Sequence, residues 1–133
     1  MYRSSIPVLM RSLKNLIHIL EKGAAHAEAK GLDPTVLVNS RLYPDMFPLS
    51  KQVQIASDVA RRGIARLTSA EVPSIEDTET TFPELIERIQ QSLTYLETFT
   101  PEQVNGSADK DVELPIGKGE TMILKGWPFL TFF

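Results

Sequence analysis

The sequence predicts an all-α fold, an up-and-down four-helix bundle with a small β-hairpin before a shortened fourth helix. Three observations lead to this prediction. Apolar residues recur every three or four positions over three long segments, as on one face of an amphipathic helix. Two β-prone runs, residues 112–116 and 121–125, flank a glycine-rich turn. Residues 127–133 are strongly apolar with a proline near their start, which is typical of the first turn of a buried helix.

The first helix is predicted over residues 4–30, where one apolar stripe runs along the whole segment. Gly31 is a natural stop, because glycine readily adopts the left-handed conformation that ends many helices. The connection over residues 33–44 holds several apolar side chains, so we expect an ordered crossover.

The second helix is predicted to run to about Thr68, with Asp45 as its N-cap and Pro48 in its first turn. Its apolar arc is wide, because Ile55 and Val59 form a second stripe beside the main one. A helix with so wide an arc needs neighbours on two sides. We therefore expect it to lie at the centre of the bundle.

The third helix is predicted over residues 81–99, and Pro101 breaks the pattern after it. Thr81 and Glu84 fit a capping box, in which each side chain bonds to the other residue's backbone N–H. Glu84 and Arg88 are four residues apart. This spacing predicts an exposed ion pair worth a few tenths of a kcal/mol.

The apolar side chains at positions 129–133 need a surface to cover them. Burial of each such side chain is worth roughly 1.5–3 kcal/mol, and three predicted helices offer too little surface for all of them. We therefore expect self-association, as a homodimer or another homo-oligomer. The candidate interface residues are Phe129, Leu130, Phe132 and Phe133.

Composition limits the classes of function. The chain of 133 residues is expected to form one domain, residues 1–133. A net charge of −3 argues against nucleic-acid binding, because phosphate contacts need clustered lysine and arginine side chains. The absence of cysteine excludes disulfides and thiolate nucleophiles. The sequence contains no run of roughly 20 apolar residues, so we expect no membrane partner. It also lacks the apolar region of a signal peptide, so we expect a cytoplasmic location.

Several segments resemble the domain-of-unknown-function family nineteen-ninety-three (DUF1993), which is grouped with the DinB/YfiT-like putative metalloenzymes. The segments are RLYPDMFPL at 41–49, QVQIASD at 52–58, ETTFPEL at 79–85 and LPIG at 114–117. The resemblance spans the chain and implies a DinB-like bundle. It also implies that family members continue past residue 133 with a histidine-containing fourth helix. The DUF1993 family itself supplies no established reaction, whereas better-known members of the superfamily are enzymes.

The same resemblance implies a divalent metal held by three histidines of the second and fourth helices. The histidines of this chain, His18 and His26, both belong to the first predicted helix. They are eight residues apart, which at 1.5 Å per residue places them about 12 Å apart along the axis. One ion cannot bind both, because metal–nitrogen distances are about 2 Å. From the residues themselves we predict no metal and no other cofactor.

Five residues are candidates for binding a ligand. Gln52 lies between the two apolar stripes of the second helix, so we expect it to point inward. It would either orient a ligand or be a buried amide that specifies packing. Arg41 and Asp45 flank Tyr43, and form either the polar mouth of a pocket or an ion pair and cap. Trp127 would line the same pocket or anchor the terminal segment.

The remaining polar residues are expected at the surface. Gln54 and Asp58 lie on the arc of the second helix opposite the core. Glu76, Asp77 and Glu79 form an acidic run without the spacing of a calcium-binding loop. We interpret this run as a solvated turn.

The leading functional hypothesis is a non-catalytic helical bundle protein that self-associates. One alternative, which rests on the resemblance alone, is a metal- or thiol-dependent transferase or hydrolase. A second alternative is a small-molecule binding module with a pocket near Gln52, Tyr43 and Trp127, its ligand unknown. Because the sequence assembles no metal or nucleophile site, it favours a non-catalytic role over an enzyme.

Overall fold

The computed structural model describes residues 1–132 and is mostly helical. A short 3-10 turn, η1 (Tyr2–Ser4), precedes the long helix α1 (Ile6–Lys30). The further helices are α2 (Pro34–Val38), α3 (Leu49–Thr68), α4 (Phe82–Glu97), α5 (Pro101–Asn105) and α6 (Gly126–Phe132). The strands β1 (Asp111–Gly117) and β2 (Glu120–Lys125) pair in an antiparallel hairpin between α5 and α6. None of the helices within the described residues is long and apolar enough to cross a membrane.

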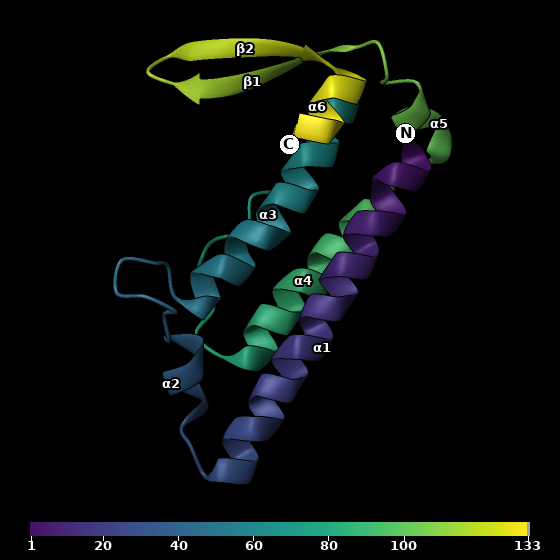
Figure 1. Cartoon of the computed structure of the whole chain (residues 1–133). Coiled ribbons are helices and arrows are strands. Elements are labelled where there is room, and N and C mark those ends of the chain that lie inside the picture. The colour runs from purple at the N-terminus through teal and green to yellow at the C-terminus, as the bar shows by residue number, and fades with distance from the viewer. Residues whose placement is uncertain (133) are drawn as a thin grey trace.

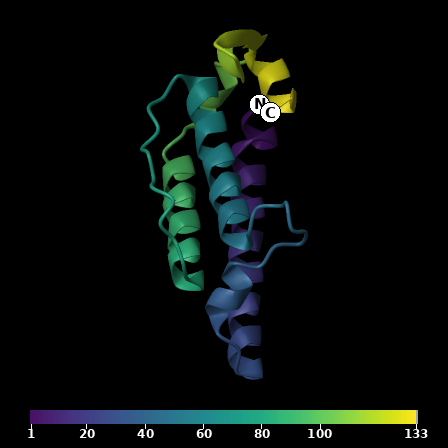
Figure 2. The ribbon, with the colours of Figure 1, turned by 90° about the vertical axis from the view of Figure 1, so that its left-hand side faces the viewer.

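The three long helices form an elongated bundle in which α4 packs against both α1 and α3 (Figure 1). The hairpin, α5 and α6 lie at one end of this bundle, and α2 lies near the other end (Figure 1). The crossover between α2 and α3 stands out from the bundle as an extended loop (Figure 2). The two ends of the bundle therefore carry different structures, and a site at one end is remote from the other.

The core consists of the predicted apolar stripes. On α1 the buried residues recur every seven positions, so this helix contributes a narrow stripe. Helix α3 contacts every other helix of the bundle and β1, which agrees with the central position expected for it. Its second stripe, however, is open to solvent, because Ile55 and Val59 are both exposed. The expectation that neighbours cover α3 on both sides is wrong for these two residues.

The ends of the helices follow the sequence in most places. Gly31 ends α1 in the left-handed conformation, as predicted. The capping box of Thr81 and Glu84 is present at the start of α4. Asp45, in contrast, does not cap α3, which begins only at Leu49. The Leu49 N–H donates to the carbonyl of Ser40 at 2.9 Å, and this bond satisfies one of the free N–H groups at the helix start without a side-chain cap.

The predicted crossover and the break at Pro101 each contain a short helix. Asp33 caps α2 by accepting a hydrogen bond from the Thr35 N–H at 3.0 Å. Pro101 occupies the first turn of α5, which Thr100 and Gln103 cap as a second capping box. Proline is tolerated there because the first-turn N–H groups have no helical partner.

The apolar terminal segment is partly covered by its own chain. Helix α6 packs against α3 and the hairpin, and Phe129 is only 1% exposed. Leu130 is half-buried, whereas Phe132 is 70% exposed. Phe133, the fourth predicted interface residue, lies outside the described residues. The expectation that another subunit must cover this segment is therefore wrong for Phe129.

Close backbone contact explains the glycine that begins α6. A Cβ added to Gly126 would lie 1.9 Å from the carbonyl oxygen of Ser107. The N–H of Trp127 then donates to the carbonyl of Ala108 at 3.1 Å. These contacts place α6 directly against the turn before the hairpin and turn the Phe129 side chain into the core.

Candidate functional site

An apolar pocket of about 570 Å³ opens where α1, α2, the crossover and the start of α3 meet. Leu20 of α1 and Phe82 of α4 are buried and line its inner part. A Cβ at Gly23 would lie 3.1 Å from the Phe82 ring, so the glycine lets this ring approach α1 closely. The volume lies within the range of small-molecule sites, roughly 300–1,000 Å³.

The outer wall of the pocket is apolar and exposed to solvent. Ile19 lines it from α1, and Leu42, Met46 and Phe47 line it from the crossover. All four side chains are exposed, Ile19 to 60%. A soluble chain rarely gathers large apolar side chains around an open hollow without a binding role.

Polar groups lie along the side of the pocket that the crossover and α3 form. Nη1 of Arg41 donates to the carbonyl of Met46 at 2.7 Å. Nε2 of Gln52 makes a longer bond, 3.4 Å, to the carbonyl of Phe47. The first bond lies within the crossover and the second joins the crossover to α3, and both side chains keep further donors for a ligand.

The structure brings together two of the five predicted ligand-binding residues. Arg41 and Gln52 line the pocket, but Gln52 is exposed at its edge rather than pointing into the bundle. Tyr43 and Asp45 are exposed and do not line it, and within the described chain Asp45 forms no ion pair with Arg41. Trp127 belongs to α6 at the opposite end of the bundle (Figure 1), so it cannot share this pocket.

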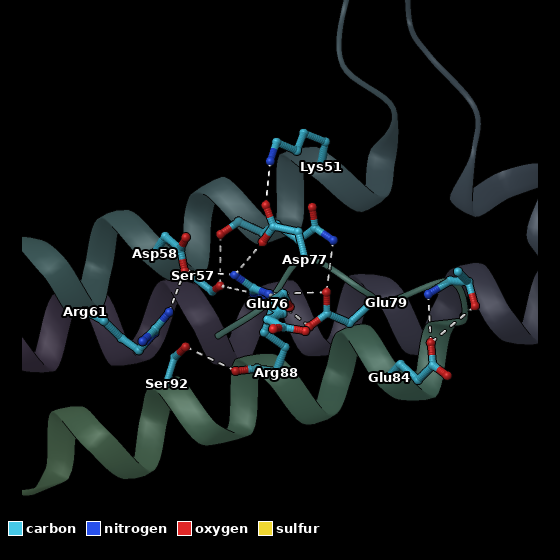
Figure 3. A network of polar contacts seen from close by, with 12 residues as sticks. Lys51, Ser57, Asp58, Arg61, Glu76, Asp77, Glu79, Glu84, Arg88 and Ser92 are labelled. Carbon is cyan, nitrogen blue, oxygen red and sulfur yellow. Dashed lines mark hydrogen bonds and ion pairs between the residues drawn. The ribbon is translucent and has the colours of Figure 1, made fainter. Parts of the chain in front are cut away.

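Sequence reasoning missed a buried polar network centred on Arg88 of α4 (Figure 3). The Arg88 side chain is 1% exposed. Its guanidinium forms ion pairs with Asp58 of α3 at 2.9 Å and with Glu79 at 2.9 Å. A third ion pair joins it to Asp77 at 3.0 Å, and its Nε donates to Ser57 Oγ at 3.0 Å.

A second buried arginine extends the network along α3. Arg61 pairs with Asp58 and donates to the carbonyl of Pro73 at 2.7 Å. Gln54, also buried, donates to Glu79 at 2.9 Å. Together the two arginines and Gln54 hold the loop between α3 and α4 against both helices.

These contacts correct four expectations from the sequence. The acidic run is not simply a solvated turn, because Asp77 and Glu79 pair with the buried Arg88. Gln54 and Asp58 are not surface residues, because the loop that carries Glu79 covers them. Arg88 does not form an exposed pair with Glu84, whose carboxylate instead accepts hydrogen bonds from the N–H groups of Thr80 and Thr81. A helical wheel could have found Arg88, since it shares a face with the buried residues Leu85, Ser92 and Leu96.

The charges of the network stabilise one another. Burial by itself lowers the pKa of Arg88, but its hydrogen bonds with Glu79 and Asp58 outweigh this effect and raise the pKa above its usual value. A permanently charged arginine surrounded by carboxylates serves to fix the loop. We therefore assign the network a structural role and take the pocket as the candidate functional site.

Low pH is expected to weaken the attachment of the loop between α3 and α4, because the Asp77 carboxylate becomes protonated. The hydrogen bond from Lys51 lowers the pKa of Asp77 below its ordinary value of 3.8, despite an opposing effect of burial. A carboxyl whose pKa is lower in the folded state adds stability above its unfolded pKa and loses it as the pH falls through the folded value. At neutral pH the free energy of unfolding of wild type should therefore exceed that of Asp77→Asn, and this difference should disappear below about pH 4. Urea unfolding between pH 7 and pH 2 measures this, and a constant difference would contradict it.

The residues present do not fit the metal site that the DinB resemblance implies. His18 and His26 are both exposed on α1, and His18 lies 3.8 Å from Glu21 of its own helix. Helix α3 (Leu49–Thr68) contributes no histidine. Among residues 1–132 no group of three or more histidine, aspartate or glutamate side chains is placed to hold an ion.

Comparisons with known proteins agree on the relationship of this chain. The family model described as "Domain of unknown function (DUF1993)" matches residues 1–133. A crystal structure of a DinB family member protein from Shewanella denitrificans is 39% identical, with a TM-score of 0.86. That match covers 98% of this chain and 73% of the other. No curated protein matches the chain.

Proposed function

This chain belongs to the DUF1993 family and has a DinB-like fold, and from this premise we propose that it is a non-catalytic protein that binds a small, largely apolar molecule. The observation that carries the proposal is the pocket beside the crossover. It combines buried apolar surface at Leu20 and Phe82 with exposed apolar surface at Ile19 and Phe47. Apolar ligands bind such hollows by removing both surfaces from water.

The chemistry of the pocket lining supports binding rather than catalysis. Among the described residues that line it, Arg41 is the single charged side chain, and no histidine or carboxylate accompanies it. General acid–base catalysis needs a group that exchanges a proton near the working pH, which a guanidinium does not do. The carboxylates of the Arg88 network are held in ion pairs and anchor a loop.

A charge placed in the pocket is expected to abolish ligand binding without unfolding the protein. Ile19→Glu introduces a carboxylate at an exposed position of the lining, so its cost to stability should be small. Val8→Glu is the matched control, because Val8 is an exposed residue of α1 that does not line the pocket. A thermal-shift screen of apolar compounds should give hits with wild type and Val8→Glu but not with Ile19→Glu. Hits that persist with Ile19→Glu would refute the site.

Self-association is a second candidate function that a separate observation favours. Helix α6 lies against α3 (Figure 1), and both helices expose apolar side chains. Ile55 and Val59 are exposed on α3, and Trp127 and Phe132 on α6. We propose that a second copy of the chain covers these exposed side chains, as in a homodimer with a two-fold axis.

Removal of the most exposed of these rings is expected to break the association. Phe132→Asp should convert the protein to a monomer in size-exclusion chromatography with light scattering, because it places a charge in the proposed apolar contact. Phe47→Asp, at a similarly exposed phenylalanine of the crossover, should leave the molar mass unchanged. Wild type that is already a monomer at low micromolar concentration would rule out this proposal.

Two further expectations remain predictions. A divalent metal, and with it a transferase or hydrolase activity, rests on the resemblance to the DinB superfamily alone. Elemental analysis of the purified protein, repeated with His18→Ala and His26→Ala, tests for the metal. The cytoplasmic location is likewise a prediction from the sequence.

A further inference from the structure

We propose that the pocket beside the crossover selects an amphiphile with an anionic head group, and that Arg41 binds this head. The inference rests on the proposed binding function and adds the class of ligand. The lining of the pocket has an apolar side and a polar side. One side is formed by aliphatic and aromatic side chains, and the polar side chains Ser40, Arg41 and Gln52 lie along the crossover and the adjoining first turns of α3.

Arg41 has donors to offer at this position. A guanidinium carries five N–H groups, and within residues 1–132 one of those of Arg41 bonds to the carbonyl of Met46. Within residues 1–132 its guanidinium forms no ion pair with a carboxylate. This distinguishes it from Arg61 and Arg88, whose charges are matched by Asp58 and Glu79.

The backbone contact of Arg41 also orients it. The 2.7 Å bond to the Met46 carbonyl holds the side chain against the crossover, whose turn is closed by the Met46 N–H bond to Tyr43 at 3.0 Å. Met46 itself lines the pocket, so the arginine and the apolar wall belong to one local structure. An oriented guanidinium loses less side-chain entropy when it binds an anion than a free one does.

Charge complementarity decides between the classes of head group. The chain carries a net charge of −3, yet the only charged side chain among the described residues of this lining is positive. A carboxylate or another small anion gains a charge-assisted hydrogen bond there, an alcohol gains a weaker bond, and an ammonium is repelled. The Gln52 amide can add a hydrogen bond to the same head group.

Three probes with the same eight-carbon chain test the inference: octanoate, octanol and octylammonium. Each is titrated into the full chain, and amide chemical shifts measured by NMR report both the site and the affinity. Octanoate is expected to bind most tightly and octylammonium most weakly, with shifts at the amides of Leu20 and Phe82. Arg41→Gln should weaken octanoate about tenfold, as expected for loss of a charge-assisted bond, and leave octanol within about twofold.

The controls separate failure of this inference from failure of the proposed function. Arg11→Gln removes an equal charge from an exposed position of α1 that does not line the pocket, and should leave all three affinities unchanged. Equal affinities for the three probes, or an Arg41→Gln variant that weakens octanol as much as octanoate, would overturn the anionic head group and leave apolar binding intact. If no probe shifts the pocket amides, or if Ile19→Glu leaves binding unchanged, both proposals fail. If dilution of the protein alone shifts these amides, a second copy occupies the pocket, and both proposals fail as well.

Discussion

Replacement of Arg88 by methionine is expected to lower the free energy of unfolding by about 3–5 kcal/mol, because it leaves the largely buried carboxylate of Glu79 without its cationic partner. The Arg88 side chain is 1% exposed and forms ion pairs with Asp58, Asp77 and Glu79. Methionine fills a similar volume, so the loss comes mainly from the uncompensated charge. Equilibrium unfolding in urea, monitored by circular dichroism, measures the change.

Arg62→Met is the matched control for this prediction. Arg62 also pairs with Asp58, at 3.4 Å, but its side chain is 52% exposed. An exposed pair contributes about 0–1 kcal/mol, so this variant should stay close to wild type. A second test adds Glu79→Gln to Arg88→Met, which should recover part of the loss because it removes the carboxylate that is left without a cation. An Arg88→Met protein as stable as Arg62→Met would show that the network contributes little to the fold.

Phe129→Ala is expected to lower the free energy of unfolding by about 3–5 kcal/mol, the usual cost of removing a fully buried aromatic ring. The ring is 1% exposed and belongs to the continuous hydrophobic core that also includes Ile64 and Val112. Its loss leaves a cavity between α6, α3 and the hairpin. Urea unfolding measures the change, and amide hydrogen exchange shows whether α6 detaches before the rest of the bundle.

The same helix provides the control. Phe132→Ala removes an identical side chain that is 70% exposed, so its effect on the unfolding of a monomer should stay within about 0.5 kcal/mol. Each variant is measured at several protein concentrations, because self-association adds a concentration-dependent term to the apparent stability. Equal losses for Phe129→Ala and Phe132→Ala would contradict the burial of Phe129 by its own chain.

The helices and their ends could be predicted because the interactions that form them are local. The apolar stripe of α1, the Gly31 stop and the capping box of Thr81 with Glu84 involve residues within about one helical turn of each other. The start of α3 could not be placed, because the Ser40 carbonyl that accepts from the Leu49 N–H lies across the crossover. Side-chain capping rules do not include such a contact.

Part of the candidate site could be predicted because some of its residues are close together in the sequence. Arg41 and Gln52 are near each other in sequence, on the crossover and the first turns of α3, and both line the pocket. The alternative in which Trp127 lines the same pocket rested on its residue type alone. The fold puts Trp127 at the other end of the bundle (Figure 1). The inner surface of the pocket, which Leu20 and Phe82 provide, was not expected at a ligand site, because both read as ordinary core residues.

Periodicity, caps and turn residues act over a few positions, so residue order alone was sufficient for the helical class and the hairpin. The family followed from the resemblance of whole segments. The placement of Arg88, Gln54 and Phe129 required the assembled chain. Arg88 and Gln54 are charged or polar and would be solvated on isolated helices. They are buried here because the loop between α3 and α4 folds back over both helices and supplies Glu79 as their shared partner. Phe129 is covered because Gly126 lets α6 approach Ser107 closely, and no local pattern encodes that contact.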